Sequence, residues 1–439
     1  MTDRRQTLSH STNRPRRFLL LGGTTHANRG DRGMQAGLAQ WLEREHPGAE
    51  VRFLASNPTE TTAALGVKSL FSPDASLAKP STRETRVSTE PREEARHRGK
   101  KFVRQARLQK RLPWWPAPPA VKEYAAHLRW ADAVFVPGSG SMNSLWWDEW
   151  LYPKAFTVLA ASAWGKPVFM TSQGVGPAFS HPLDADTARQ MFNACALVGV
   201  RDGGASAAIL RDIGVANEKI CLTGDDALLF RSTCPGIPTP RAKFLLGVNL
   251  RDSSSYGKGY PKPGIEAVAA ALIQVLEQHP DVNLVFIPIS YDAWDDDRIP
   301  AQAVAEAIGA PGRIHLIREE YDAAQLRSLI ARMDVCVGIS YHFLMFALSA
   351  GVPAAGLFQN SYYRQKVEGL FDLYDLPQYA LNFSGEAAAK NCTTLLEALG
   401  NLLDRKDELR ECLRARQESI DLDCQQSRQR LLSGLESLP

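Results

Sequence analysis

The residue with the clearest chemical potential is a histidine placed just after a predicted buried strand. An apolar run ends at Gly338, then Ser340, Tyr341 and His342 follow, and an apolar helical pattern continues to Gly351. His342 therefore lies in the first turn of a helix, where the positive end of the helix dipole lowers the pKa of an imidazole. Such a histidine can act as a general acid, as a general base or as a hydrogen-bond donor to phosphate. A satisfied buried histidine is the alternative, and the strand-end position argues against burial.

Two arginines follow other predicted strands and suit an anionic ligand. Arg201 comes directly after an apolar run that ends at Val200, and Arg251 comes after one that ends at Leu250. A guanidinium presents a planar fork of donors that matches carboxylate and phosphate groups. Exposed surface arginines are the alternative, but one arginine at each lip of a cleft favours an anion site. A later loop adds two further candidate cations for the same ligand: Arg364 and Lys366.

A glycine-containing loop follows the first predicted strand and includes Asn28, Arg29, Gly30 and Asp31. Its glycines allow close backbone approach, and the helix that follows offers free N–H groups to an anion. It matches neither GxGxxG nor GxxxxGK[ST], which excludes a dinucleotide fingerprint and a Walker loop. Asp31 can cap that helix or accept a proton from a sugar hydroxyl, and both interpretations stay open.

Two further strand-end loops are of the same kind. One contains Gly138, Ser139 and Gly140, and the other contains Gln173 and Gly174. Glycine at a strand end is often plain turn chemistry. Three such loops at one edge of a sheet predict a rim that faces a ligand.

Metal and disulfide chemistry have weak support. Three consecutive aspartates at residues 295–297 suggest a divalent cation, but without paired ligands elsewhere we interpret them as a solvated capping run. The seven cysteines form no CxxC pair and no Cys/His cluster, which argues against a disulfide framework and a structural zinc site. No metal is therefore expected.

Composition indicates a globular protein of two domains. The chain has 439 residues, 44% hydrophobic and 23% charged, too long for one ordinary core. The net charge of +3 gives no global field, so no nucleic-acid partner is expected. The first residues lack the apolar region of a signal peptide, and no apolar run approaches ~20 residues. We therefore expect a cytoplasmic protein.

Strand-like apolar runs alternate with helical patterns, as in a parallel sheet covered on both faces. The alternation occurs twice, on either side of a Pro- and Thr-rich stretch at residues 232–241 that we interpret as a linker. The predicted fold is α/β, with Rossmann-like domains at residues 14–231 and 240–392 and a ligand cleft between their strand ends. Residues 393–439 are predicted to be helical and to brace the pair.

The predicted strands cover residues 18–21, 133–136, 167–171, 197–200, 244–250, 283–288, 314–317, 335–338 and 354–358. The predicted helices cover residues 34–44, 205–213, 265–277, 300–308, 323–331 and 343–350, besides the C-terminal segment.

An Arg-rich insertion at about residues 79–116 does not fit this alternation. Its composition favours a mobile surface insertion. The alternative is a membrane-surface element at residues 96–116, in which apolar side chains lie among basic ones and two tryptophans serve as interfacial anchors. The residues concerned are Phe102, Val103, Ala106, Leu108, Trp114 and Trp115. The protein would then lie at the inner face of the membrane.

The order of these motifs resembles the polysaccharide pyruvyl transferase family. The matching segments are residues 28–31, 172–177, 200–202, 249–251, 295–297 and 338–353, followed by Lys366. They extend over most of the chain. The resemblance implies a GT-B-like fold and transfer of the enolpyruvyl unit of phosphoenolpyruvate to a sugar, as a ketal.

The resemblance also implies roles for the site residues. His342 would protonate the enol methylene or bind the departing phosphate, and Asp31 would orient or deprotonate the acceptor hydroxyl. Arg201 and Arg251 would hold the anionic donor on the C-terminal side, and the N-terminal domain would take a saccharide or lipid-linked saccharide. Phosphoenolpyruvate is a co-substrate in this scheme, and no cofactor is implied.

The chain departs from the family pattern at one position. The last motif usually reads Arg-x-His, with the arginine contacting phosphoenolpyruvate, and here Ser340 stands two residues before His342. Arg364, Lys366 or Arg251 must then neutralise the donor, or the donor differs. Two other functions stay open: a GT-B-like glycosyltransferase that uses a nucleotide sugar, and a binding protein that has lost its chemistry. The acceptor and the oligomeric state also stay open.

Overall fold

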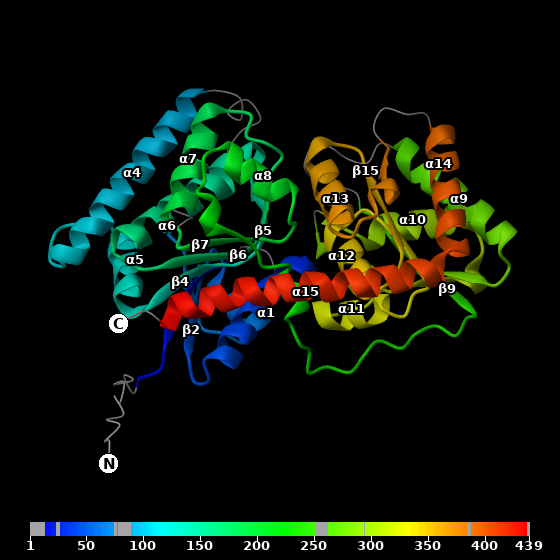
Figure 1. Cartoon of the computed structure of the whole chain (residues 1–439), viewed down its shortest axis with the longest axis horizontal. Coiled ribbons are helices and arrows are strands. Elements are labelled where there is room, and N and C mark those ends of the chain that lie inside the picture. The colour runs from blue at the N-terminus through cyan, green and yellow to red at the C-terminus, as the bar shows by residue number, and fades with distance from the viewer. Residues whose placement is uncertain are drawn as a thin grey trace, which may run out of the picture.

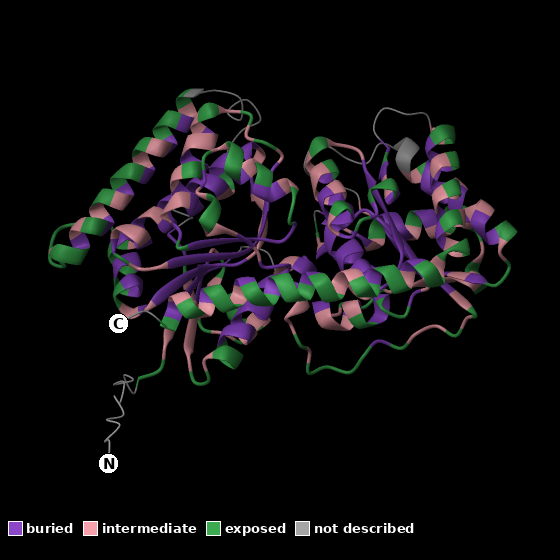
Figure 2. Cartoon of the chain, viewed as in Figure 1, coloured by how far each residue is buried: buried purple, intermediate pink, exposed green. Residues whose placement is uncertain are grey.

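The computed structural model describes residues 14–22, 27–73, 77, 89–251, 262–293, 295–383 and 388–436. They form two α/β domains side by side, each built on a parallel sheet with helices on both faces (Figure 1). The central strands of both sheets are buried, while the outer helices expose one face (Figure 2). The predicted fold class is confirmed.

The N-terminal sheet has the strand order β3-β2-β1-β4-β6-β7-β8, and β5 pairs with the end of β6. Its strands are β1 (Arg17–Leu21), β2 (Glu50–Ala55), β3 (Ser69–Phe71), β4 (Ala133–Val136), β5 (Ser139–Met142), β6 (Val168–Val175), β7 (Leu197–Val200) and β8 (Ile220–Leu222). The central strands are apolar on both faces because helices cover both sides of the sheet.

The C-terminal sheet has the strand order β13-β10-β9-β14-β15-β16. Its strands are β9 (Phe244–Asn249), β10 (Val282–Phe286), β13 (Ile314–Leu316), β14 (Val335–Gly338), β15 (Ala354–Phe358) and β16 (Ala380–Asn382). In both sheets the chain winds outward to one side of the first strand and then crosses to the other. The crossings fall between β1 and β4 and between β9 and β14, and ligands bind at the carboxyl ends of strands at such points.

Four strands, β4, β7, β14 and β15, have the predicted bounds. The unpredicted β2, β3, β8 and β16 are short or begin with polar residues, so their apolar pattern is too brief to recognise. The prediction of a loop at residues 173–174 is wrong, because β6 continues to Val175. Residues 139–140 likewise belong to the short strand β5.

The N-terminal domain carries α1 (Arg29–Glu45), α2 (Pro58–Leu65), α4 (Thr89–Arg111), α5 (Pro119–Trp130), α6 (Tyr152–Ala163), α7 (Pro182–Ala194) and α8 (Ala205–Asp212). The rest of the chain carries α9 (Lys262–Gln278), α10 (Arg298–Ile308), α11 (Ala323–Ile330), α12 (Tyr341–Ser349), α13 (Ser361–Leu373), α14 (Ala388–Asp404) and α15 (Lys406–Glu436).

Helix α1 begins earlier than predicted, at Arg29. The side chain of Asn28 caps it by accepting hydrogen bonds from the N–H groups of Gly30 and Asp31, at 3.0 and 3.2 Å. Asp31 is therefore not the cap, and its carboxylate lies in the first helical turn. Residues 23–26 of the expected loop lie outside the described residues.

Helix α15 runs along both domains (Figure 1). Leu409, Leu413 and Ile420 pack into the core of the C-terminal domain. Leu431 and Leu435 pack into a cluster of the N-terminal domain with Phe18 of β1. This helix therefore braces the pair as predicted, although the expected single helical segment is divided between α14 and α15.

The Arg-rich insertion contains an ordered helix, α4, which packs on α5 and α6. Phe102 and Ala106 are buried there, and Nε1 of Trp164 donates a 2.7 Å hydrogen bond to the carbonyl of Ala106. The prediction of a mobile insertion is wrong for residues 89–111, because the apolar face of α4 is covered by the domain. Residues 79–88 lie outside or at the edge of the described part.

This packing covers Phe102 and Ala106 and half-buries Val103 and Leu108, so these side chains of the predicted membrane-surface element face the domain to that extent. Trp114 and Trp115 remain 72% and 44% exposed at the end of α4, so that part stays a prediction. None of the described helices is both long and apolar enough to cross a bilayer. All seven cysteines lie in the described part as free thiols.

Candidate active site

The crossing points of the two sheets face each other across a cavity of about 600 Å³ between the domains. The cavity lies at the carboxyl ends of the strands, where α1 begins on one side and α12 on the other. The residues expected at the site that line it are Asn28, Asp31, Gly140, Arg201, Arg251, Ser340, Tyr341, His342 and Lys366. The parallel sheets thus bring together most of the residues selected from the sequence.

His342 is buried, with only 5% of its surface exposed. The expectation that its strand-end position keeps it open is wrong, because α1 of the other domain covers the ring. A Cβ atom on Gly30 would lie 2.0 Å from Cγ of His342, so only glycine admits the imidazole. Burial lowers the pKa of His342 well below its ordinary value. The cations Arg201, Lys366 and Arg251 lower it further.

Arg201 is the central buried cation, 3% exposed at the end of β7. Its guanidinium lies 3.7 Å from the ring centroid of Tyr341, which belongs to the other domain. Gly174 makes room for it, since a Cβ there would lie 2.9 Å from Nε of Arg201. Gly174 therefore acts by admitting the arginine and not as part of an acceptor-facing rim.

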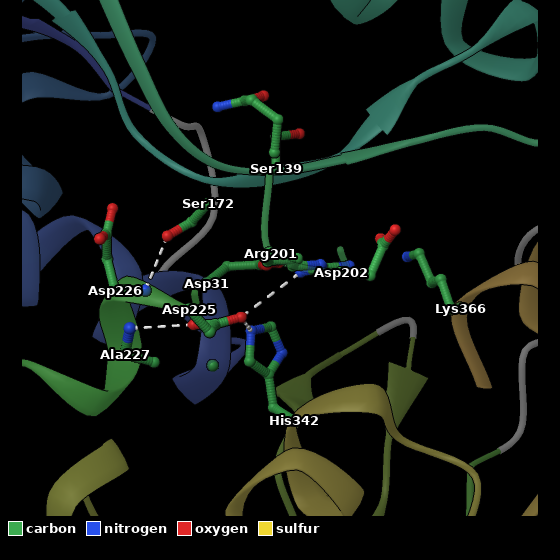
Figure 3. Close-up of polar contacts among 12 residues, drawn as sticks. Asp31, Ser139, Ser172, Arg201, Asp202, Asp225, Asp226, Ala227, His342 and Lys366 are labelled. Carbon is green, nitrogen blue, oxygen red and sulfur yellow. Dashed lines mark hydrogen bonds and ion pairs between the residues drawn. The ribbon is translucent and has the colours of Figure 1, made fainter. Parts of the chain in front are cut away.

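Asp225, which the sequence patterns do not single out, lies beside both groups. Its Oδ2 is 3.7 Å from Nη1 of Arg201 and 3.7 Å from Nε2 of His342 (Figure 3). Burial raises the pKa of Asp225 to about 7. The only sequence signal for Asp225 is an acidic pair directly after β8. Because β8 has only three residues, its apolar pattern is too short to predict that a strand ends there.

Lys366 reaches the cavity and Arg364 does not. Nζ of Lys366 lies 3.8 Å from the ring centroid of Tyr362 and bonds its hydroxyl. A Cβ on Gly140 would lie 2.6 Å from this Nζ, so the lysine extends to the opposite domain. Burial lowers the pKa of Lys366 well below its ordinary value. Arg364 is exposed, and its Nε lies 2.8 Å from Oε1 of Glu368. Residues two positions apart on a helix point to different faces, so Arg364 faces solvent while Lys366 faces the cavity.

Ser340 occupies the position of the family arginine as a buried hydroxyl, 1% exposed. Its N–H donates a 3.0 Å hydrogen bond to Oδ1 of Asn249. Its Oγ lines the cavity and has no hydrogen-bond partner among the described residues. The positive charge in this cavity therefore comes from Arg201, Arg251 and Lys366 and not from residue 340.

The three consecutive aspartates after β10 bind protein groups. Asp295 pairs with Arg251, whose Nε lies 2.6 Å from Oδ2, and Asp296 pairs with Arg298. Asp297 is buried and accepts hydrogen bonds from backbone N–H groups at 2.8 and 3.0 Å. The interpretation as a solvated capping run is therefore wrong. Within the described ranges, no group of three or more His, Cys, Asp or Glu side chains is placed to hold a metal ion.

A second cavity of about 300 Å³ adjoins the first and is walled mainly by the N-terminal domain. It shares Asp31 and Lys366 with the first cavity. The expected residues Gly138, Ser139 and Gly140 line it. Three residues that the sequence patterns do not single out line it as well: Trp146, Glu149 and Trp150.

These three residues come from η1 (Ser144–Trp146) and from a π-helical turn, η2 (Trp147–Leu151). Such turns are rare and often occur at functional sites. The sequence signal was a dense aromatic and acidic segment, SLWWDEW, directly after β5.

Two other expected residues do not line either cavity. Gln173 is fully buried, and its Nε2 donates to the carbonyls of Pro137 and Thr171 at 2.9 and 2.8 Å. Arg29 points to the other domain, where it pairs with Glu320 and lies 4.8 Å from the ring centroid of Tyr291. Gln173 thus supports the loop before β5, and Arg29 joins the two domains.

The fold is that of the GT-B class. One similar structure is a putative UDP-N-acetylglucosamine 2-epimerase from Listeria monocytogenes, with 14% identity, a TM-score of 0.56 and coverage of 92% of this chain and 91% of that one. Another is the glycosyltransferase SnogD from Streptomyces nogalater, with 16% identity, a TM-score of 0.54 and coverage of 96% and 100%. A third is UGT73P12 from Glycyrrhiza uralensis, with 9% identity, a TM-score of 0.57 and coverage of 97% and 96%. At these identities the likeness extends to the fold alone.

The family is more specific than the fold. Residues 28–358 match the model of the polysaccharide pyruvyl transferase family, and the chain belongs to that family. The match includes the start of α1, the buried Arg201 and the strand–turn–helix that carries His342. The family indicates a transferase that acts on saccharides.

Proposed function

We propose that the protein transfers the pyruvyl group of phosphoenolpyruvate to hydroxyls of a saccharide and forms a ketal. One observation carries the proposal: the interdomain space has two unlike halves. The half around His342 has a positive potential, since Arg201, Lys366 and Arg251 all lower the pKa of the imidazole. The adjoining half presents hydroxyls and aromatic rings, together with the charged side chains of Asp31, Glu149 and Lys154. An anionic donor suits the first half and a neutral sugar suits the second.

The donor carries a carboxylate and a phosphate, and the cavity offers three cations for them. The charge of Arg251 is offset by Asp295, so Arg201 and Lys366 supply most of the attraction. Lys366 takes the place of the family arginine that Ser340 replaces. Bound phosphate raises the depressed pKa values of Lys366 and His342, because an anion stabilises their charged forms.

The reaction converts the methylene carbon of the donor to a methyl group and replaces phosphate by two sugar oxygens. One hydroxyl adds to C2 while C3 takes a proton, and the second hydroxyl then displaces phosphate by breaking the C2–O bond. Of the two hydroxyl protons, one balances the proton on C3 and the other leaves with the phosphate. His342 donates the proton to C3, and the cations stabilise the departing phosphate.

The acceptor binds in the second cavity, between the hydroxyls after β4 and the tryptophans of η1 and η2. Trp146 and Trp150 are half-buried there and present apolar ring surface to a sugar. Asp31 lines both cavities, so its carboxylate can orient the attacking hydroxyl and accept its proton.

Phosphate release from phosphoenolpyruvate tests the proposal. The purified protein is incubated with the donor and a panel of saccharides, and free phosphate and ketal are measured. His342→Ala should reduce turnover by about 100-fold or more, since a positioned acid contributes 10²–10⁴-fold. Binding or turnover of nucleotide sugars, with no response to phosphoenolpyruvate in a thermal-shift assay, would instead indicate a glycosyltransferase. No turnover with either donor would indicate a binding protein.

A lipid-linked acceptor would bring the protein to the inner face of a membrane. The exposed Trp114 and Trp115, next to the basic end of α4, are the side chains we propose to meet that surface. Wild type should co-sediment with anionic vesicles at low salt, and the W114A/W115A double variant should not. Equal co-sedimentation of both proteins would exclude this role.

A further inference from the structure

Asp225 is held rigidly in a buried loop between β8 and η4 (Asp226–Leu228). Its Oδ1 accepts a 2.9 Å hydrogen bond from the N–H of Ala227. The hydroxyl of Ser172 accepts from the N–H of Asp226 at 2.7 Å and donates to the carbonyl of Gly224 at 2.8 Å (Figure 3). Ser172 adopts a φ of 56°, which is uncommon outside glycine, and this aims its hydroxyl at the loop. One carboxylate oxygen is thus fixed, which sets the direction of the other.

The second oxygen, Oδ2, faces Arg201 and His342. It lies 3.7 Å from Nε2 of His342, and the side chains of Asp225 and His342 are only 2% and 6% exposed. Neither atom has a hydrogen-bond partner among the described residues. Hydrogen bonds between catalytic side chains commonly tighten from such separations when substrate binds. The two atoms are therefore placed to share a proton.

Among the described residues, the charged groups around His342 are three cations and several carboxylates. Of the carboxylates, Asp295 pairs with Arg251, and Glu149 and Asp292 line the same cavity. Arg201 lies at the end of β7, Arg251 at the end of β9 and Lys366 on α13, and all three disfavour the imidazolium. The N-terminal ends of α1 and α12 also lie against the ring, and their positive dipole ends likewise disfavour the imidazolium. On the opposing side stand Asp225 and, at the start of α1, Asp31. Of these two carboxylates, Asp225 is the one in ion-pair range of the ring.

We propose that Asp225 is the positioning residue for His342, a carboxylate of the N-terminal domain that orients the imidazole through Nε2 and holds its proton against the surrounding cations. The inference rests on the proposed function, in which His342 is the acid that protonates C3. The carboxylate keeps the Nε2–H tautomer, which leaves Nδ1 to exchange a proton with the substrate. Since the two residues belong to different domains, the pair of His342 and Asp225 forms only when the two domains are in contact.

The charge state of Asp225 links this pair to pH. Burial raises the pKa of Asp225 to about 7 and lowers the pKa of His342, so the pair takes up one shared proton as the pH falls through about 7. Activity should therefore decline as the pH rises above about 7 and the shared proton is lost. Without the carboxylate, the same decline should begin at lower pH.

The test uses the full-length protein with ¹⁵N-labelled histidine and long-range ¹H–¹⁵N spectra, which report the nitrogen that carries each ring proton. The chain has nine histidines, and the His342→Gln variant identifies the signal of His342. Inorganic phosphate is the anionic probe, so no turnover is needed. Above about pH 8, where Asp225 is ionised, wild type should show the proton on Nε2. In Asp225→Asn, the amide group takes the place of Oδ2 and donates to Nε2, which should move the proton to Nδ1.

A second variant and a matched control complete the test. Asp225→Ser keeps an oxygen that can accept from the N–H of Ala227, and it removes the carboxylate if the asparagine variant does not fold. Both variants should lower the pKa of His342, with a tenfold or greater loss of proton affinity. Asp226→Asn removes the adjacent buried carboxylate, which contacts Thr171 and Arg428, and should leave the imidazole unchanged.

An unchanged tautomer and pKa of His342 in a folded Asp225 variant would overturn the proposal. An equal change in Asp226→Asn would also overturn it, since the effect would then belong to the loop as a whole. Absence of phosphate release from phosphoenolpyruvate in wild type would contradict the proposed function while leaving the spectroscopic comparison intact. If turnover is present, Asp225→Asn should lower kcat by about 100-fold and shift the alkaline limb of its pH profile to lower pH.

Discussion

The two walls of the interdomain space differ in how their side chains are held. On the C-terminal side, His342 and Ser340 are buried at the start of α12, and Arg251 is paired with Asp295. On the N-terminal side, the lining of the second cavity includes half-buried tryptophans and the exposed Glu149. Rigid buried charge suits a small anion whose reacting atoms must be placed closely. Open aromatic and hydroxyl surface suits a larger, neutral partner.

Gly30 is where the two walls touch, and its replacement should have the largest effect. In Gly30→Ala the new Cβ would lie 2.0 Å from Cγ of His342, so the ring or α1 must move. A displacement of about 1 Å at the reacting groups can cost ~100-fold, so we expect at least that loss of kcat/KM in a phosphate-release assay. Gly400→Ala is the control, because nothing lies within 4 Å of a Cβ there. Full activity in a folded Gly30→Ala protein would show that His342 is not held in place by α1.

Variants of Lys366 and Arg364 compare the face of α13 that lines the cavity with the face that is exposed to solvent. Lys366→Ala should raise the KM for phosphoenolpyruvate by about 10- to 100-fold, as expected for loss of a hydrogen bond to a charged group. Arg364→Ala removes an exposed pair with Glu368 and should change the KM by less than about twofold. Equal effects of the two variants would place the donor elsewhere.

Replacement of Trp150 tests whether the second cavity binds the acceptor. Trp150→Ala should raise the KM for the acceptor by about 5- to 10-fold through lost stacking and leave the KM for the donor nearly unchanged. Steady-state kinetics with each substrate varied in turn measures both values. A larger effect on the donor than on the acceptor would contradict the division of the space into two halves.

Proton uptake gives the smallest but most direct signal. The pKa values of His342 and Lys366 are lowered by burial, which favours the neutral forms of both groups in the free protein. Binding an anion raises both values, and at pH 7 we expect uptake of about one proton for each phosphate bound. Calorimetry in buffers of different ionisation enthalpy measures this number. Zero uptake or proton release would mean that the anion binds away from these two groups.

The sequence predicted the fold class and the position of the site because both depend on strand ends. The runs that end before Arg201, Arg251 and Ser340 are apolar enough to mark buried strands. Carboxyl ends of parallel strands share one edge of a sheet, so these side chains had to meet in a cleft. The same reasoning missed Asp225, because β8 has three residues and little apolar pattern.

Two other features could not be predicted from local patterns: the direction in which each side chain of a helix points, and the contacts between segments that lie far apart in the sequence. Arg364 and Lys366 are equal candidates as cations, and only the rotation of α13 turns one to the cavity and the other to solvent. Gln173 and Gly174 carry loop-like residue types, yet the neighbouring strands extend β6 through both.

The sequence by itself determined two α/β domains and the presence of His342, Arg201 and Lys366 near their ligand edges, because strand and helix patterns are local. The tertiary structure alone decided that α1 covers His342 and that Asp225 stands beside it. These contacts join residues of different domains, and such contacts follow from how two folded surfaces pack and not from any local pattern. Burial by that packing is also the first cause of the lowered pKa of His342.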